Sequence, residues 1–307
     1  MIATDRIEAV LSLALGQTIV VRSRLPLGGG SDGSVERIET NGGAFVLKSL
    51  PGAGNARARL AGEAEGLKAI AACRTSLIVP RPMASWEVDP DDHGAPFLLL
   101  PHVRTARSDR DLETRLGRGL AELHRTRSAD GDAASVTRPR YGFVIDTWCG
   151  ATRQPNTWSD TWRRFYAESR LGWQIETASS RGCLTPRDRS QLERIVERLD
   201  ELLIEPPEGP ALIHGDLWAG NVLATSEGPA VIDPAAAFAH REMEFGMTSL
   251  FGGLGPTGLA AYQEAFPLSP GWQERLPLYQ LYHLLNHLNL FGTGYHEQVM
   301  AIVRRYR

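Results

Sequence analysis

The most informative segment of the chain reads Ile213-His214-Gly215-Asp216-Leu217-Trp218-Ala219-Gly220-Asn221. It is followed by the apolar run 222–224, a turn around Glu227, and a second apolar run that ends at Asp233. We predict an antiparallel hairpin folded at Glu227, with Asn221 at the start of its first strand and Asp233 at the end of its second. Such a hairpin places Asn221 and Asp233 side by side, and the preceding loop brings Asp216 to them.

Asp216, Asn221 and Asp233 together have the composition of a phosphoryl-transfer site. Two oxygen ligands suit Mg²⁺, which takes one or two carboxylates and leaves room for water and substrate phosphates. We therefore expect Asn221 and Asp233 to hold Mg²⁺, and Asp216 to accept the proton of an acceptor hydroxyl. Each residue alone would be an ordinary turn-capping side chain. Their combination with the hairpin favours catalysis.

Phosphoryl transfer also needs a cation on the phosphates, and Lys48 is the best match in the sequence. It lies at the end of a predicted strand over 44–50, which precedes a predicted helix over 56–72. Glu63 lies on the apolar face of that helix and is expected to hold the lysine in place. Glu65 is the competing partner, and we favour Glu63 because it is carried inward with the apolar side chains.

A glycine-rich loop precedes this lysine. Gly28, Gly29 and Gly30 lie between predicted strands at 18–22 and 35–40. Runs of this kind are often plain linkers, but a strand on each side makes a loop whose backbone N–H groups could cover phosphates. We therefore expect the loop to bind the phosphates of a nucleotide.

We predict two lobes, residues 1–103 and 104–307, in an α+β fold. The first lobe is expected to contain an N-terminal helix, an antiparallel sheet that includes a strand within 96–101, and the helix at 56–72. The second lobe is expected to be mainly helical and to carry the catalytic hairpin. One of its predicted helices follows a capping box of Ser108 and Asp111 and another opens at Pro186; the rest cover roughly 158–180, 241–251, 257–266 and 273–305.

The composition excludes several classes of protein. A formal net charge of −3 gives no basic surface for nucleic acid. The three cysteines are widely spaced and form no CxxC pair, so we expect neither disulfides nor a cysteine zinc site. The sequence shows no signal peptide and no apolar run long enough for a membrane span. We expect a cytoplasmic protein without nucleic-acid or membrane partners, and its oligomeric state stays open.

With these residues in hand, the chain resembles the fructosamine (ketosamine) kinases, a family within the aminoglycoside-phosphotransferase-like branch of the protein-kinase fold. The resemblance covers nearly the whole chain. It rests on His214 to Asn221, Ile232-Asp233-Pro234-Ala235, Tyr141-Gly142-Phe143, Gln154-Pro155-Asn156, Trp162, His240-Arg241-Glu242, Phe251-Gly252-Gly253, and Leu281 to Gly292. Trp218 and the Asp-Pro pair are specific to this family, so a protein-kinase-like, two-lobed α+β fold is expected.

The resemblance implies an ATP- and Mg²⁺-dependent kinase that phosphorylates a sugar hydroxyl of free or protein-bound ketosamines. It implies that Lys48, paired to Glu63, contacts the α- and β-phosphates of ATP. Adenine would meet the segment between the lobes, which is Leu100, Pro101, His102 and Val103. The acceptor sugar would stack on Trp218, and His287 would line the same pocket.

Two positions depart from the family pattern. Ser31 stands near the position where many relatives have a cysteine, so no redox switch through the glycine-rich loop is assumed. Pro101 stands where relatives often have glutamate, which shifts the expected contact with adenine. Neither residue belongs to the catalytic set.

Several assignments have alternatives. Trp218 could instead be a core or lid aromatic. His283 and His287 are four residues apart on one predicted helix and could bind zinc, although no third ligand is evident nearby. Arg241 and Glu242 are expected to form an ion pair that braces the hairpin, and the alternative for them is contact with the substrate.

Two other functions compete with ketosamine phosphorylation. The first is a kinase of another hydroxylated amine, such as an aminoglycoside or an amino alcohol. A polycationic acceptor needs an acidic pocket, and the segment from Tyr279 to Tyr295 contains no Asp or Glu, which disfavours aminoglycosides. The second is a catalytically silent nucleotide-binding scaffold. The presence of the lysine, the base and both metal ligands argues against it.

Overall fold

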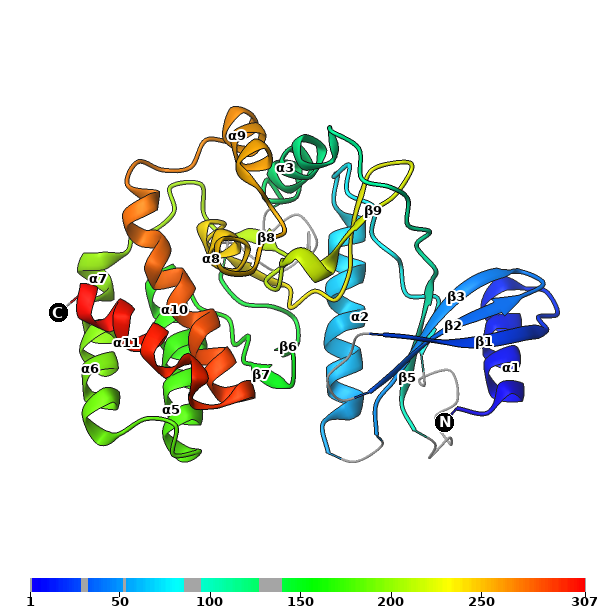
Figure 1. Ribbon diagram of the computed structural model, residues 1–307, viewed down its shortest axis with the longest axis horizontal. Coiled ribbons are helices and arrows are strands. Elements are labelled where there is room, and N and C mark those ends of the chain that lie inside the picture. Colours follow the sequence, from blue (N-terminus) through cyan, green and yellow to red (C-terminus); the bar gives the residue numbers. More distant parts are fainter. Residues whose placement is uncertain (1, 29–32, 52–53, 86–94, 127–139, 307) are drawn as a thin grey trace.

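The computed structural model describes residues 2–28, 33–51, 54–85, 95–126 and 140–306. Its N-terminal lobe is an antiparallel sheet of order β1-β2-β3-β5-β4. The strands are β1 (Val21–Leu27), β2 (Ser34–Thr40), β3 (Gly43–Ser49), β4 (Ala84–Ser85) and β5 (Phe97–Pro101), and the lobe's helices are α1 (Thr4–Leu15) and α2 (Ala56–Ala72). Figure 1 shows this sheet at one end of the molecule and the helical lobe at the other, with α2 between them.

The predicted strand at 18–22 begins too early. β1 starts at Val21 and runs to Leu27, because the preceding backbone is bound by side chains. The Ile19 N–H donates to Ser12 Oγ at 2.8 Å, and the Val20 N–H donates to Asn41 Oδ1 at 2.8 Å. Gly28 follows directly after β1, whereas Gly29 and Gly30 lie outside the described residues.

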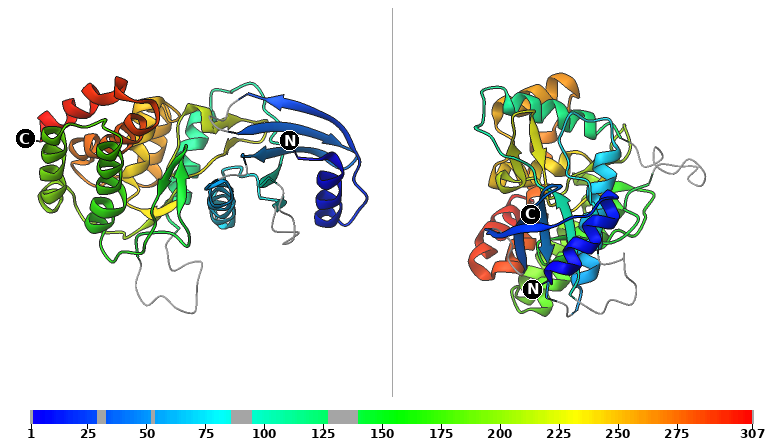
Figure 2. Two further views of the ribbon diagram at one scale, coloured as in Figure 1. Left: turned by 90° about the horizontal axis from the view of Figure 1, so that it is seen from below. Right: turned by 90° about the vertical axis from the view of Figure 1, so that its right-hand side faces the viewer.

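The C-terminal lobe is mainly helical, as Figure 2 shows from two further sides. Its helices are α3 (Leu112–Leu123), α4 (Trp162–Tyr166), the π-helical turn η2 (Ala167–Gly172), α5 (Trp173–Ser180), α6 (Pro186–Glu197), α7 (Leu199–Leu202), η3 (Ala219–Asn221), α8 (Glu242–Phe251), α9 (Pro256–Ala265), α10 (Trp272–Phe291), η4 (Thr293–Tyr295) and α11 (His296–Arg305). Its short strand pairs are β6 (Thr147–Cys149) with β7 (Thr152–Gln154), β8 (Ala211–Ile213) with β11 (Ala237–Ala239), and β9 (Val222–Ala224) with β10 (Pro229–Val231).

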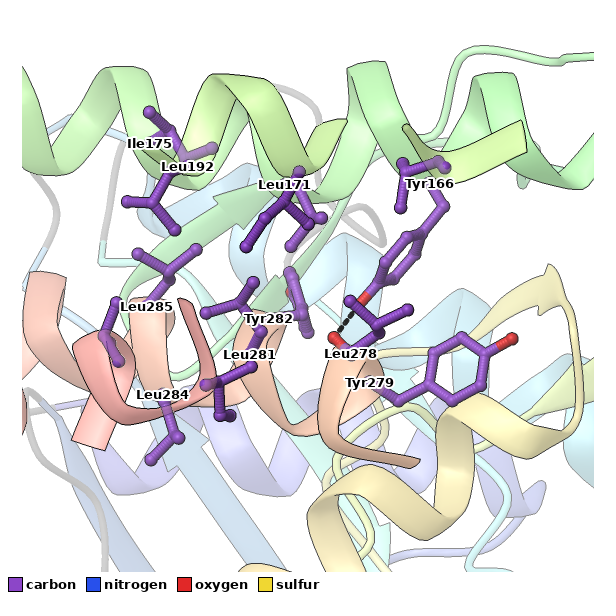
Figure 3. Packing of buried hydrophobic residues seen from close by; sticks show 14 of the residues in the cluster. Tyr166, Leu171, Ile175, Leu192, Leu278, Tyr279, Leu281, Tyr282, Leu284 and Leu285 are labelled. Atoms are coloured by element: carbon purple, nitrogen blue, oxygen red, sulfur yellow. Dashed lines mark hydrogen bonds between the residues drawn. The ribbon is translucent and has the colours of Figure 1, made fainter. Parts of the chain in front are cut away.

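The core of this lobe forms around α10, whose leucine and tyrosine side chains pack against α5 and α6 (Figure 3). The Tyr166 hydroxyl donates to the Leu278 carbonyl at 2.6 Å, so the buried phenol keeps a hydrogen bond. The helical pattern predicted over roughly 273–305 is confirmed, and it divides into two α-helices because α10 ends at Phe291. Gly292 has φ 84° and ψ −165°, a backbone conformation that glycine adopts readily and that ends the helix, and α11 begins only at His296.

Two predicted helix starts have different outcomes. The capping box of Ser108 and Asp111 is wrong: α3 begins at Leu112 without a side-chain cap. The Asp109 carboxylate accepts from the Asp111 N–H at 3.0 Å and ties the turn before the helix. The helix opening at Pro186 is confirmed, and Thr185 forms a capping box with the third residue of that helix.

The catalytic hairpin forms with a register one residue from the predicted one. Val222 pairs with Val231, so Asn221 lies opposite Ile232, whose N–H donates to the Asn221 carbonyl at 3.1 Å. The turn is closed by the Thr225 hydroxyl, which accepts from the Glu227 and Gly228 N–H groups at 3.1 Å. Its centre therefore lies half a residue before Glu227.

The expected ion pair between Arg241 and Glu242 is wrong. Adjacent residues at the start of a helix point in different directions, so each finds another partner. Arg241 pairs with Glu208, and Glu242 accepts two hydrogen bonds from Arg275, at 2.8 and 2.6 Å. The two pairs hold α8 against neighbouring segments of the helical lobe. Neither pair includes a residue of the hairpin.

Helix α2 belongs to the sheet lobe by sequence, but it also packs against β6 of the helical lobe. Leu60 and Leu67 lie in the core beneath the sheet. On another side of the helix, a Cβ atom added at Gly62 would lie 2.8 Å from the Asp146 carbonyl oxygen and 3.2 Å from Thr147 Cα. The missing side chain therefore lets α2 approach the backbone next to β6 closely.

Candidate active site

A cavity of about 450 Å³ lies between the two lobes. Its walls come from β2, β3 and α2 on one side and from the β6–β7 hairpin, the catalytic loop and α10 on the other. Sequence-predicted residues that line it are Lys48, Glu63, Asp216, Trp218, Asn221, Asp233 and His287. The structure therefore gathers residues that are up to 239 positions apart in the chain, as Lys48 and His287 are.

Lys48 lies at the centre of the charged groups in this cavity. Its Nζ donates to Glu63 Oε1 at 2.6 Å and also pairs with the Asp233 carboxylate. Burial lowers the pKa of Lys48, but the two carboxylates more than offset this effect, so its pKa lies above the ordinary value. Glu65 instead pairs with Lys68 at the surface, at 2.8 Å. The lysine is therefore a fixed cation, and its partner on α2 is Glu63.

Asp216 lies in a tightly tied loop after β8. The Asn221 side chain donates to the Asp216 carbonyl at 2.8 Å, and the Asp216 N–H donates to His214 Nδ1 at 3.3 Å. Burial raises the pKa of Asp216 to about 7, and the charges of Asp233 and Glu244 act in the same direction. The loop thus presents a carboxylate whose proton affinity is far above that of a solvated aspartate.

Glu244 holds this loop from behind and was missed by sequence reasoning. Its carboxylate accepts from the His214 N–H at 2.6 Å and from the Gly215 N–H at 3.0 Å. Gly215 has φ 81°, and a Cβ there would lie 2.2 Å from the Ala235 carbonyl oxygen, so the loop requires glycine. The available signal was an acidic residue within the apolar run of α8, which indicates a buried carboxylate with partners.

The metal-ligand candidates Asn221 and Asp233 both reach the cavity. Because the Asn221 Nδ2 group donates to Asp216, its Oδ1 atom is the group left to face a cation. Asp233 has φ 58° and keeps 43% of its side chain exposed, which leaves carboxylate oxygen available beside Lys48. One amide and one carboxylate oxygen fit the hard-ligand preference of Mg²⁺.

Zinc binding by His283 and His287 is not supported. No group of three or more His, Cys, Asp or Glu side chains that could hold a metal occurs in the part of the chain that the structure describes. Burial lowers the pKa of His283 to about 3 and that of His287 to about 4, so both rings are neutral at pH 7. His287 lines the cavity, with its ring centroid 4.3 Å from that of Phe251 and 5.0 Å from that of Tyr295.

Trp218 is exposed at the cavity and is not a core residue. It keeps 41% of its surface accessible. A Cβ added at Gly220 would lie 2.3 Å from the Trp218 ring, so the glycine lets the indole lie flat against the catalytic loop. With Phe251, His287 and Tyr295 it forms an aromatic wall that can face the ring of a sugar.

The other described residues that were predicted to bind the nucleotide do not line this cavity. The His102 N–H donates to the Ala44 carbonyl at 3.0 Å and continues the sheet, so it is not available to adenine. Leu100 is buried in β5, and neither it nor His102 nor Val103 lines the cavity described above. Gly28 is also absent from the walls, where Gly33 takes its place.

Sequence reasoning also missed one wall of the cavity. Trp148, Cys149 and Gly150 come from the β6–β7 hairpin, and Asn286 comes from α10. Side chains on α10 and on the β6–β7 pair come together only in the folded chain. The two strands have three residues each, and so short a pattern does not predict that they form a wall of the cavity. Asn286 did lie within a family-like motif, which was the available signal.

The fold and the site together define an ATP-dependent phosphotransferase of the protein-kinase-like class. A solved structure of a thermostable mutant of aminoglycoside phosphotransferase APH(4)-Ia is similar over 97% of this chain and 98% of its own, with TM-score 0.60. At 16% identity this likeness shows the fold alone. Among the described helices, none is both long and apolar enough to span a bilayer.

Closer relatives narrow the class. The chain is 36% identical over 296 residues to a chloroplastic protein-ribulosamine 3-kinase of Oryza sativa subsp. indica, covering 96% of this chain and 81% of that protein. It is 32% identical to the ketosamine-3-kinase of Mus musculus, covering 90% and 92%. A solved structure from Thermobifida fusca that carries a fructosamine-3-kinase name matches with TM-score 0.82 and 31% identity over 98% and 97%.

The model of the fructosamine kinase family matches residues 3–307, and the chain belongs to that family.

Proposed function

We propose that this enzyme transfers the γ-phosphoryl group of ATP to a sugar hydroxyl of a ketosamine, either a fructosamine or a ribulosamine, free or on a protein. The observation that carries the proposal is the convergence of Asp216, the Lys48–Glu63 pair, Asn221 and Asp233 on one cavity. The relatives named for ribulosamine and ketosamine phosphorylation supply the substrate class.

Each residue has a distinct role in the proposed reaction. Asp216 accepts the proton of the acceptor hydroxyl as that oxygen attacks the phosphorus atom. Lys48, fixed by Glu63, binds phosphate oxygens and stabilises the negative charge on the transferring group. Asn221 and Asp233 would hold Mg²⁺, which supplies further charge neutralisation on the phosphates when bound.

Adenine is proposed to lie at the segment between the lobes. Because Pro101 has no N–H and the His102 N–H is bound to Ala44, the contacts in this segment fall to the Pro101 carbonyl and the Val103 N–H. Among the described residues, no hydrogen bond to the Val103 N–H is formed. Leu100 supports this segment from the core.

The acceptor end of the cavity favours a neutral, hydroxylated ring over a polycation. Among the described residues, the carboxylates that line the cavity are Glu63, Asp216 and Asp233, and two of them are bound to Lys48. An aminoglycoside would need additional acidic groups to bind its ammonium groups. The aromatic wall around Trp218 and His287 instead matches the apolar face of a sugar.

We further propose that the enzyme works in the cytoplasm. Cys73, Cys149 and Cys183, the three cysteines of the sequence, form no disulfide with one another, which suits a reducing compartment.

The test is ATP consumption by the purified protein with Mg²⁺ against a fructosamine, a ribulosamine, kanamycin and choline. We expect turnover of the two ketosamines and loss of at least about 10³-fold in kcat for Asp216→Asn, with ATP binding retained. Turnover of kanamycin or choline alone would replace the proposed acceptor class. ATP binding without turnover of any acceptor would instead support a scaffold.

A further inference from the structure

A chain of three buried amides leads from the interior of the helical lobe to the cavity. Asn289 and Asn286 lie on α10, and Gln174 lies on α5. Their exposed fractions are 5%, 1% and 1%. Of the three, Asn286 lines the cavity, and the other two lie behind it. A buried amide loses free energy for each hydrogen bond that it fails to make, so the bonds that these amides form constrain their orientations. Asn289 Oδ1 has no partner among the described residues.

The hydrogen bonds fix the direction in which each amide points. Asn289 Nδ2 donates to the Gln174 carbonyl at 3.0 Å and to Gln174 Oε1 at 2.6 Å. Gln174 must therefore present its Nε2 group to Asn286, and it donates to Asn286 Oδ1 at 3.3 Å. With its oxygen used in this way, Asn286 turns its NH₂ group toward the cavity.

One of the two N–H bonds of this group is used inside the protein. Asn286 Nδ2 donates to the Cys149 carbonyl at 3.3 Å. Burial raises the pKa of Asp216, and a hydrogen bond from the Cys149 thiol partly offsets this rise. Asn286 and Asp216 are thus the two neighbours of Cys149 in the cavity wall. Burial raises the pKa of the Cys149 thiol, and a side-chain hydrogen bond from Asn286 opposes this rise, so the second N–H bond of Asn286 is directed at the thiol sulfur. Sulfur is a weak acceptor, so a sugar oxygen in the cavity can compete for this N–H bond.

We propose that Asn286 determines acceptor specificity, by donating this N–H bond to a sugar oxygen next to the hydroxyl that is phosphorylated. The inference rests on the proposed function and names a recognition contact within it. A neutral amide donor selects a hydroxyl or carbonyl oxygen and disfavours an ammonium group, which also has only donors. An acceptor that lacks the oxygen leaves a buried donor unpaired, which is costly.

The primary test is Asn286→Asp, because this change keeps the shape of the side chain and replaces the donor with an acceptor. We expect kcat/KM for the ketosamine to fall about 10- to 100-fold, while the KM for ATP and the affinity for ADP stay within about twofold. Unchanged kcat/KM for the ketosamine would overturn the proposal. An equal loss of nucleotide affinity would also overturn it, because it would indicate a general structural role.

A panel of monodeoxy ketosamines locates the contact. For the wild-type enzyme, we expect one deoxy analogue that retains the phosphorylated hydroxyl to have a lower kcat/KM than the parent ketosamine. For Asn286→Ala, we expect the same analogue and the parent to have equal kcat/KM values. If the discrimination against every analogue survives in Asn286→Ala, the residue makes no such contact. Absence of any ketosamine turnover by the wild type would instead reject the proposed function, and the inference would fall with it.

Gln174→Glu tests the orientation without altering a cavity residue. The new carboxylate accepts where the amide donated, so it draws the Asn286 NH₂ group away from the cavity and should reproduce the loss in kcat/KM. Gln280→Ala is the matched control on α10, since Gln280 donates to Ser249 at 2.9 Å away from the cavity. A normal Gln174→Glu enzyme would contradict the proposed orientation.

Discussion

At the scale of single residues, Lys48 joins charged groups of the two lobes. It is in contact with carboxylates from both lobes, Glu63 on α2 and Asp233 after β10. The side chains of Lys48 and Glu63 are only 13% and 17% exposed, so removing one leaves the other charged in a poorly solvated place.

Replacing Lys48 by methionine should therefore affect both catalysis and folding. We expect kcat/KM to fall by at least about 100-fold, and the free energy of unfolding to fall by about 3 kcal/mol because Glu63 and Asp233 lose their cation. Steady-state kinetics and urea unfolding measure the two effects. Lys68→Met is the control, because its exposed pair with Glu65 should contribute less than about 1 kcal/mol.

Trp218 gives a second prediction at this scale. Trp218→Ala removes the exposed indole from the cavity, and we expect the KM for the ketosamine to rise about tenfold or more while the KM for ATP is unchanged. Trp218→Phe, which keeps an aromatic face, should recover most of the loss. Equal effects on both KM values would show that the ring supports the loop instead of the acceptor.

At the scale of elements, the catalytic loop depends on α8 through Glu244. Burial raises the pKa of Glu244, but hydrogen bonds from His124 and the His214 backbone outweigh this effect and place the pKa below its ordinary value. The carboxylate is therefore ionised in the folded protein and binds two backbone N–H groups of the loop. Such charge-assisted bonds are stronger than those of a neutral amide.

Glu244→Gln should loosen this loop. The amide can replace one accepting oxygen and places a donor at the other, so we expect a loss of about 2 kcal/mol in the free energy of unfolding. Exchange of the Gly215 amide hydrogen should become faster. Glu264→Gln is the matched control, since Glu264 is exposed and 3.4 Å from Arg118. Unchanged exchange at Gly215 would contradict the role given to Glu244.

Elements with strong local signals were predicted well from the sequence. The helix over 56–72 coincides with α2, because its apolar spacing is uninterrupted. The register of the catalytic hairpin was one residue off, since the Thr225 hydroxyl that closes the turn leaves no pattern in the sequence. Glu244 and Asn286 were missed because their partners come from distant segments, and only tertiary contacts assign them a role.

At the scale of the whole molecule, buried histidines link stability to pH. His124, His214, His240 and His283 are at most 1% exposed. Burial lowers the pKa of all four, so they are neutral in the folded protein at pH 7. In the unfolded chain each would take up a proton below a pH of about 6.5.

The free energy of unfolding should therefore be highest above pH 6.5 and fall as the pH drops toward the folded pKa values. Each histidine adds a slope of up to about 1.4 kcal/mol per pH unit. Urea unfolding between pH 7.5 and 5.5 measures this dependence. His283→Phe should reduce the slope of the free energy of unfolding against pH by about the contribution of one histidine. A urea midpoint that does not change with pH in the wild type would contradict the prediction.

The close packing of α2 on β6 has a consequence for how the molecule unfolds. One helix is shared by two bodies: it closes the core under the sheet, and through Gly62 it lies against the Asp146 backbone of the other lobe. The sheet therefore cannot detach from α2 without exposing the apolar surface of the helix to water. Heating should accordingly melt both lobes in a single calorimetric transition.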